Sequence, residues 1–100
     1  MTSVHLADRI ADDLRRIVVH LVEHDAPASE ERIAGIFRAL AMLADNPLIG
    51  RLVRDEFREL VIGRDSHGYL ALYIYKPLDD TVHVLAIRSQ REAGYAGNLP

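Results

Sequence analysis

Three short apolar segments near the C-terminal end constrain the fold of this chain more than any other feature. They span residues 57–62, 69–75 and 81–89, and two turn-like segments, 63–68 and 76–80, separate them. β-Branched and aromatic residues bounded by Gly, Pro and Asp are typical of strands joined by tight turns. The pattern predicts an antiparallel three-stranded meander.

Two amphipathic helices are predicted before the meander. The first apolar stripe lies between about residues 8 and 24 and consists of Ile10, Leu14, Ile17 or Val18, and Leu21. The second stripe ends before Pro47 and consists of Ile33, Ile36, Phe37, Leu40 and Leu43. Asp8 is predicted to cap the first helix, and Pro27 suits the first turn of the second. Because only a short break separates the helices, we expect an antiparallel hairpin.

A short opening strand at residues 3–6 completes a β-α-α-β-β-β order. Residues 47–56 show no clear periodicity of apolar residues and are predicted to form a connecting loop. The predicted fold class is α+β, with the two-helix hairpin packed on a mainly antiparallel four-stranded sheet. A length of 100 residues supports one core, so we expect a single domain over 1–100 with a short flexible tail at 96–100.

Alternation along the strands indicates that both faces of the sheet are apolar. One face of the second strand carries Tyr69, Ala71, Tyr73 and Tyr75, and the other carries Leu70, Leu72 and Ile74. In the third strand, Val82, Val84 and Ala86 share one face, and His83, Leu85 and Ile87 share the other. A single helical hairpin covers only one face of a sheet. We therefore expect the tyrosine row to face a partner protein, unless the helices and tail cover more than this arrangement assumes.

The composition excludes several classes of protein. The chain has no cysteine, which excludes a disulfide framework and a thiolate nucleophile and favours a cytoplasmic location. No apolar run approaches the roughly 18–20 residues of a membrane helix, and the first residues lack the features of a signal peptide. A formal net charge of −3 provides no general attraction to nucleic acid, so any such contact would depend on a local arginine cluster.

The arginines of the second half offer such a cluster. They are Arg51, Arg54, Arg58, Arg64, Arg88 and Arg91. Strand alternation predicts Arg88 on the face of Val84 and Ala86, with Arg91 just past the strand. Arginines bind carboxylates or phosphates through two parallel N–H groups. Because Glu56, Glu59 and Glu92 lie close in sequence, surface ion pairs of little energetic value are the alternative.

Residues 20–24 (His-Leu-Val-Glu-His) match a helical zinc motif. His20 and His24 would share a helix face, and Glu23 would lie beside them as a base. No feature marks a third ligand, and histidines near a helix C-terminus also interact favourably with the helix dipole. We therefore predict no metal site and no cofactor.

Several segments, in this order and spacing, resemble the RelE/ParE family of bacterial toxins from type II toxin–antitoxin operons. They are residues 13–17 (Asp-Leu-Arg-Arg-Ile), 46–51 (Asn-Pro-Leu-Ile-Gly-Arg), 57–62, 69–75 and 86–92 (Ala-Ile-Arg-Ser-Gln-Arg-Glu). The resemblance extends from the first strand to Tyr95. It implies an antitoxin whose C-terminal segment lies in a groove of the toxin. The expected antitoxin-binding residues are Tyr69, Tyr73, Tyr75, Ile17, Leu21 and Phe37.

The family divides by target. RelE-like members cleave ribosome-bound mRNA with basic, histidine and tyrosine residues, whereas ParE-like members lack that set and poison DNA gyrase. Here the segment 67–70 (His-Gly-Tyr-Leu) lacks the arginine of the nucleases, and Ser89 stands where many of them carry histidine. The resemblance therefore favours a ParE-like, non-enzymatic toxin of a plasmid-stabilisation module that inhibits gyrase. The expected target-binding residues are Arg88, Arg91, Glu92 and Tyr95.

Two alternatives stay open. If the chain is a ribosome-dependent mRNA endoribonuclease, Arg88, Arg91 and Tyr95 would form a reduced catalytic set. If it is a degenerate relative, it would bind an antitoxin without being toxic. In each case we expect a cytoplasmic protein in a hetero-oligomer with its antitoxin and no association with a membrane.

Overall fold

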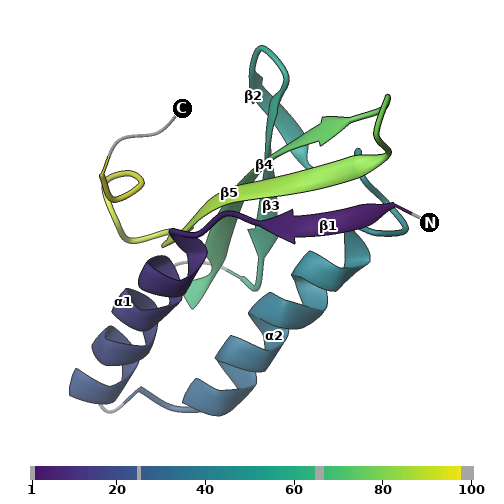
Figure 1. The fold of residues 1–100 in the computed structure, drawn as a ribbon. Coiled ribbons are helices and arrows are strands. Elements are labelled where there is room, and N and C mark those ends of the chain that lie inside the picture. The colour runs from purple at the N-terminus through teal and green to yellow at the C-terminus, as the bar shows by residue number, and fades with distance from the viewer. Residues whose placement is uncertain (1, 25, 65–66, 98–100) are drawn as a thin grey trace.

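The computed structural model describes residues 2–24, 26–64 and 67–97. Two helices, α1 (Ile10–Glu23) and α2 (Ser29–Met42), form a hairpin that packs on one face of a sheet (Figure 1). The five strands are β1 (Ser3–Leu6), β2 (Arg51–Arg54), β3 (Phe57–Ile62), β4 (Tyr69–Lys76) and β5 (Thr81–Ser89), in the order β1-β5-β4-β3-β2. β1 runs parallel to β5, and the other neighbours are antiparallel. The predicted α+β class and helical hairpin are confirmed.

The prediction of four strands is wrong by one, because the segment 47–56 contains β2. This strand forms a hairpin with β3 through Asp55, whose φ is 46°. All four β2 residues are exposed, and the register shifts between Leu52 and Arg54. A short edge strand with no buried face has no alternation of apolar and polar residues, so its sequence carried no strand signal.

The helices lie where the apolar stripes predicted, but both begin differently. Pro27 precedes Ala28, the N-cap of α2, so the prediction that Pro27 lies in the first turn is wrong. Arg9 rather than Asp8 holds the N-cap position of α1, and no side chain caps this end. The stripes face the sheet through Ile10, Ile17, Leu21, Ile36, Leu40 and Leu43. Val18 and Phe37 are 40% and 49% exposed, so each stripe is narrower than its apolar residues suggested.

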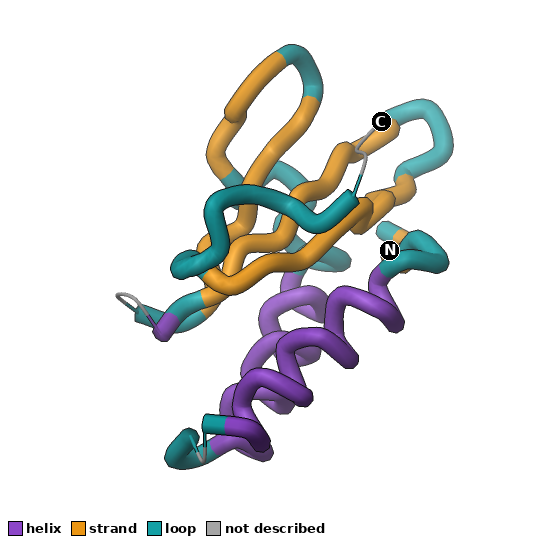
Figure 2. The backbone as a smooth tube through the Cα atoms, turned by 90° about the vertical axis from the view of Figure 1, so that its left-hand side faces the viewer, coloured by secondary structure: helices purple, strands orange, loops and turns teal. Residues whose placement is uncertain are grey.

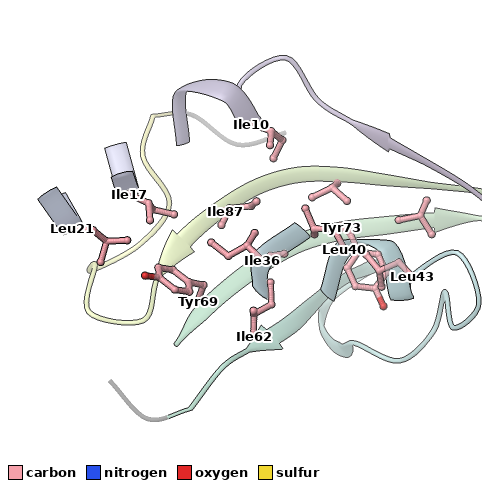
Figure 3. Close-up of a cluster of buried hydrophobic side chains, with 13 residues drawn as sticks. Ile10, Ile17, Leu21, Ile36, Leu40, Leu43, Ile62, Tyr69, Tyr73 and Ile87 are labelled. Carbon is pink, nitrogen blue, oxygen red and sulfur yellow. The ribbon is translucent and has the colours of Figure 1, made fainter. Parts of the chain in front are cut away.

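The tyrosine row lies in the core beneath the helices, so the prediction that it forms an uncovered face is wrong. Tyr73 is 0% exposed and Tyr69 is 5% exposed, and Ile36 packs in the same cluster (Figure 3). The Tyr73 hydroxyl accepts a hydrogen bond of 2.8 Å from the Gly50 amide. A Cβ on Gly50 would lie 2.6 Å from the Tyr73 ring, so glycine allows this close approach. A tyrosine can thus bury its ring once its hydroxyl finds a partner.

A β-bulge in β5 changes which residues share a face. Leu85 is the extra residue between the two registers of the β4–β5 pairing. Beyond it, Ile87 joins Val84 in the core, whereas Ala86 and Arg88 lie on the opposite face. The predictions that Ile87 lies opposite Val84 and that Arg88 shares the face of Val84 are therefore wrong. One inserted residue inverts the parity of every residue after it.

The chain after β5 covers much of the face away from the helices. Leu70 and Leu72 on this face are only 5% and 4% exposed. Tyr95 contacts Glu59 and Arg88 there. Figure 2 shows the loop after β5 passing in front of the strands. The strand-parity argument for an empty partner groove therefore fails. Residues 98–100 of the predicted flexible tail lie outside the described residues.

Side chains of α1 complete the edge of β5 where β1 ends. β1 pairs only with residues 81–84. Farther along, the Ile87 amide donates to the Asp13 carboxylate at 3.0 Å, and Arg16 donates to the Ile87 carbonyl at 3.2 Å. These contacts satisfy backbone groups that a neighbouring strand would otherwise bind.

Asp13 is buried at 2% exposure, and arginines offset its charge. Arg9 and Arg16 donate to its carboxylate at 3.2 and 2.9 Å. Burial by itself raises the pKa of Asp13, but the hydrogen bonds from Arg9, the Ile87 amide and Arg16 outweigh burial and hold the pKa below its usual value. The carboxylate therefore stays ionised within the fold.

Asp13→Asn should lower the free energy of unfolding by about 3 kcal/mol, because it leaves two partly buried arginines without their anion. Asp12→Asn is the matched control, since the Asp12 side chain is 78% exposed on the same helix. Urea denaturation of both variants measures the difference. Because the folded-state pKa is lowered, the Asp13 contribution is complete above its unfolded pKa of about 4 and disappears as the pH falls through the folded value. Equal losses in both variants would contradict this role.

Candidate functional site

The predicted target-binding residues Arg88 and Tyr95 come together on the sheet face away from the helices. The guanidinium carbon of Arg88 lies 5.2 Å from the centroid of the Tyr95 ring. Arg88 also donates to the Glu92 carbonyl at 2.7 Å. The Tyr95 hydroxyl donates to the Glu59 carboxylate at 2.8 Å. Both side chains therefore hold the segment 90–97 against the sheet.

Glu92 joins this segment to the first helix. Its carboxylate accepts a hydrogen bond of 2.7 Å from Arg16 and another of 2.6 Å from the Ser89 amide. A further link is the hydrogen bond from Arg9 to the Ala96 carbonyl. The fourth predicted residue, Arg91, has an exposed position and does not belong to the Arg88–Tyr95 pair. The structure thus groups three of the four predicted target-binding residues.

Glu59 is a residue of this site that sequence reasoning assigned to surface ion pairs. It is only 8% exposed, and it also accepts from Arg51 at 3.0 Å. Burial raises the pKa of Tyr95, and the hydrogen bond to the Glu59 carboxylate raises it further, so the hydroxyl remains protonated. An acidic residue within the predicted strand segment 57–62 was the available signal.

The six arginines of the second half do not form one basic surface. Arg58 pairs in register with Tyr73 on the helix-facing side and donates to the Gly50 carbonyl at 2.7 Å. Arg88 lies on the opposite side, and Arg54 stacks over the Phe57 ring at 4.4 Å. An extended cationic track for a nucleic-acid backbone is therefore not formed by these residues.

Two hollows lie along the helical hairpin. The first, a cavity of about 590 Å³, lies between the end of α1, the start of α2 and the adjoining ends of β4 and β5, and we call it the tip cavity. Ile17, Leu21 and Tyr69, three of the predicted antitoxin-binding residues, line it. The second hollow is a groove between the helices, lined by Leu21, Val22 and Phe37 among others. We call it the hairpin groove.

The remaining predicted antitoxin-binding residues lie elsewhere. Tyr73 is enclosed in the core, and Tyr75 is half-buried with its hydroxyl donating to Asp80 at 2.8 Å. Tyr73 therefore has no surface for a partner to contact while the protein is folded. Phe37, at 49% exposure, is the most accessible of the predicted antitoxin-binding residues.

The zinc-like motif places two histidines in contact. The rings of His20 and His24 stack with centroids 4.1 Å apart, and Nδ1 of His24 lies 2.9 Å from the His20 carbonyl. Within residues 2–24, 26–64 and 67–97, no three His, Cys, Asp or Glu residues are grouped closely enough to hold a metal ion. None of the described helices is long and apolar enough to cross a membrane.

Tyr95→Phe should speed amide hydrogen exchange in residues 90–97 about tenfold, because a hydrogen bond to a charged, buried partner is worth about 1.5–3 kcal/mol, part of which is lost on local opening. Tyr75→Phe is the control, since it removes a hydroxyl that binds a carboxylate elsewhere on the same sheet. Exchange followed by mass spectrometry compares the two variants. Unchanged exchange in 90–97 would mean that Tyr95 does not hold the segment.

Comparison with known protein families assigns the chain to one of them. A family model described as the ParE toxin of the type II toxin–antitoxin system, parDE, matches residues 4–94. The match includes both helices, the strands from the second residue of β1 onward, and most of the segment after β5. No curated protein matches the chain. Since the family model covers nearly the whole chain, this protein belongs to the ParE toxin family of type II toxin–antitoxin systems.

Proposed function

We propose that the protein acts in the cytoplasm as a toxin that inhibits DNA gyrase by protein–protein contact, and that a cognate antitoxin neutralises it. Membership of the ParE family supports this choice over mRNA cleavage. The structural observation that carries it is the engagement of Arg88 and Tyr95 within the chain. The residues that a nuclease would use instead position the segment 90–97.

The segment 90–97 is the proposed contact surface for gyrase. Its polar anchors, Arg88, Glu92 and Tyr95, determine its shape, while Arg91 is exposed at the surface. A segment held at both ends is preorganised, which reduces the entropy lost when a partner binds. The four residues therefore share the target-binding role, three by positioning and Arg91 by contact.

The hairpin groove is the proposed main contact for the antitoxin. Val22 and Phe37 are 71% and 49% exposed on its walls. An apolar groove between two helices suits the apolar face of an amphipathic segment from a partner. Ile17, Leu21 and Tyr69 extend this surface into the tip cavity.

Gyrase supercoiling in the presence of the purified toxin tests the target. Supercoiling should stop at a toxin concentration that leaves mRNA intact in a translating ribosome reaction, and added antitoxin should restore it. Arg91→Ala should weaken the inhibition about tenfold, as expected for an exposed interface arginine. Arg15→Ala, which removes an exposed arginine of α1, is the control. Unaffected supercoiling together with ribosome-dependent mRNA cleavage would overturn the proposal.

The endoribonuclease alternative draws on one specific observation. Tyr95 contacts both Arg88 and Glu59, and Nε of Arg88 is buried without a hydrogen-bond partner among the described residues. A carboxylate and a guanidinium around a hydroxyl are groups that acid–base chemistry on RNA uses. Under this alternative, Glu59→Gln would abolish mRNA cleavage in the same ribosome assay. A degenerate, non-toxic relative would instead leave growth unaffected when its gene is induced alone.

Phe37→Ala should weaken antitoxin binding about tenfold or more, because it removes a large, half-exposed ring from the hairpin groove. Leu78→Ala is the matched control, since Leu78 is a fully exposed apolar residue in the β4–β5 turn. Isothermal titration with the antitoxin encoded beside the toxin gene measures both affinities. Equal affinities for the two variants would exclude the groove as the main contact.

A further inference from the structure

Ser89 and Glu92 bind each other in the turn that follows β5. The Ser89 amide donates to the Glu92 carboxylate at 2.6 Å, and the Glu92 amide donates to the Ser89 carbonyl at 3.1 Å. The Ser89 hydroxyl also accepts a hydrogen bond of 3.2 Å from the Arg91 amide. This reciprocal arrangement resembles the capping box at the start of many helices. We call residues 89–92 the exit turn, because the chain leaves the sheet there beside α1 (Figure 1).

Two arginines hold the exit turn through Glu92. Arg88, on the sheet face away from the helices, donates to the Glu92 carbonyl at 2.7 Å. From α1, Nε and Nη2 of Arg16 donate to the two oxygens of the Glu92 carboxylate at 2.7 and 3.4 Å. Two N–H groups on one carboxylate fix its orientation as well as its distance. The direction in which the chain leaves β5 therefore depends on where Arg16 holds Glu92.

Arg16 serves two carboxylates with one guanidinium group. While Nε and Nη2 bind Glu92, Nη1 donates to Asp13 at 2.9 Å. The Arg16 side chain is only 34% exposed, so solvent screens this group of charges incompletely. Without the guanidinium, Asp13 and Glu92 would lie close together as like charges that repel each other.

The two carboxylates differ in their freedom to move apart. Asp13 is 2% exposed, and Arg9 and the Ile87 amide also bind it. The Glu92 side chain is 30% exposed and belongs to a turn at the surface. Repulsion would therefore move Glu92 and leave Asp13 in place. Because the Glu92 carboxylate accepts the Ser89 amide, the exit turn would move with it.

We propose that Arg16 is the positioning residue of the gyrase contact. By neutralising Glu92 beside Asp13, it holds the exit turn against α1 and so sets the direction of the segment 90–97. This inference rests on the proposed inhibition of gyrase, and it adds to that surface a residue 76 positions from Glu92 in sequence. The role is electrostatic, so loss of the Arg16 charge is harmful only while Glu92 is charged.

Arg16→Met tests this role, because it removes every donor and keeps the length of the side chain. Inhibition of supercoiling should then require about tenfold more toxin, since the two carboxylates lose the charge that offsets them. Amide hydrogen exchange in the exit turn should become about tenfold faster for the same reason. The purified toxin, gyrase with relaxed plasmid, and exchange followed by mass spectrometry provide both measurements.

Glu92→Gln separates repulsion from simple loss of a hydrogen bond. The amide oxygen of glutamine can still accept the Ser89 amide, but it carries no charge. Alone, this change should weaken inhibition no more than about threefold. Arg16→Met combined with Glu92→Gln should inhibit within about threefold of Glu92→Gln alone, so the second substitution rescues most of the loss.

Further variants keep the test independent of folding. If Arg16→Met does not fold, Arg16→Gln, which is also uncharged, replaces it in the same comparison. Arg38→Met is the matched control, since the Arg38 side chain is 63% exposed on α2 and pairs with Glu31. Ile36→Val, at a fully buried position of α2, lowers stability without touching the exit turn. Neither control should change inhibition, and urea denaturation measures the stability of each variant.

The outcomes separate the positioning role from the function on which it rests. Additive losses for Arg16→Met and Glu92→Gln, or unchanged exchange in the exit turn, would overturn the role of Arg16 and leave gyrase inhibition intact. Equal losses of inhibition in Arg16→Met and Ile36→Val would also overturn it, because they would reflect general destabilisation. Absence of inhibition by the wild-type protein would overturn both the inference and the proposed function.

Discussion

The carboxylate of Asp13 accepts a hydrogen bond from the amide of Ile87, and the rest of the structure depends on this contact. β1 is too short to cover the whole edge of β5, so the second half of that edge would present unpaired backbone groups inside the protein. Asp13 and Arg16 supply the missing partners from α1. The first helix is thereby joined to the sheet by a charged, buried contact in addition to its apolar stripe. Removing one charged side chain of this network leaves the charges of the others uncompensated in a region of low dielectric.

The same network connects the core to the proposed functional segment. Arg16 binds Asp13 on one side and Glu92 on the other, so the position of α1 determines where the chain leaves β5. From there the segment crosses to the far side of the sheet, and Tyr95 binds Glu59. Arg88 and Tyr95, residue types that a nuclease site would use, therefore position the chain after β5. This use of Arg88 and Tyr95 is consistent with the ParE family, to which the match over residues 4–94 assigns the chain.

The two proposed interfaces lie on different parts of the molecule. The hairpin groove lies between the two helices and the tip cavity at their connected end, whereas the segment 90–97 is anchored on the opposite face of the sheet. Glu92 and Arg91 line the tip cavity as well as belonging to that segment, so the two surfaces meet there. An antitoxin that fills the cavity would contact the base of the proposed gyrase-binding segment. Neutralisation by direct contact with this segment is thus compatible with the geometry, and it requires no change of fold.

The sequence by itself determined the two helices, the three-stranded meander and the family, because helical periodicity, turn residues and ordered motifs are properties of neighbouring residues. Only the tertiary structure decided which faces are covered. The bulge at Leu85 inverts the parity of Ile87 and Arg88, and β2 is a strand only because it pairs with β3. Tyrosine has an apolar ring and a polar hydroxyl, so alternation alone cannot assign it to the core or to an interface. The Gly50 amide that binds the Tyr73 hydroxyl lies 23 residues away in sequence, and that distant partner makes burial of Tyr73 favourable.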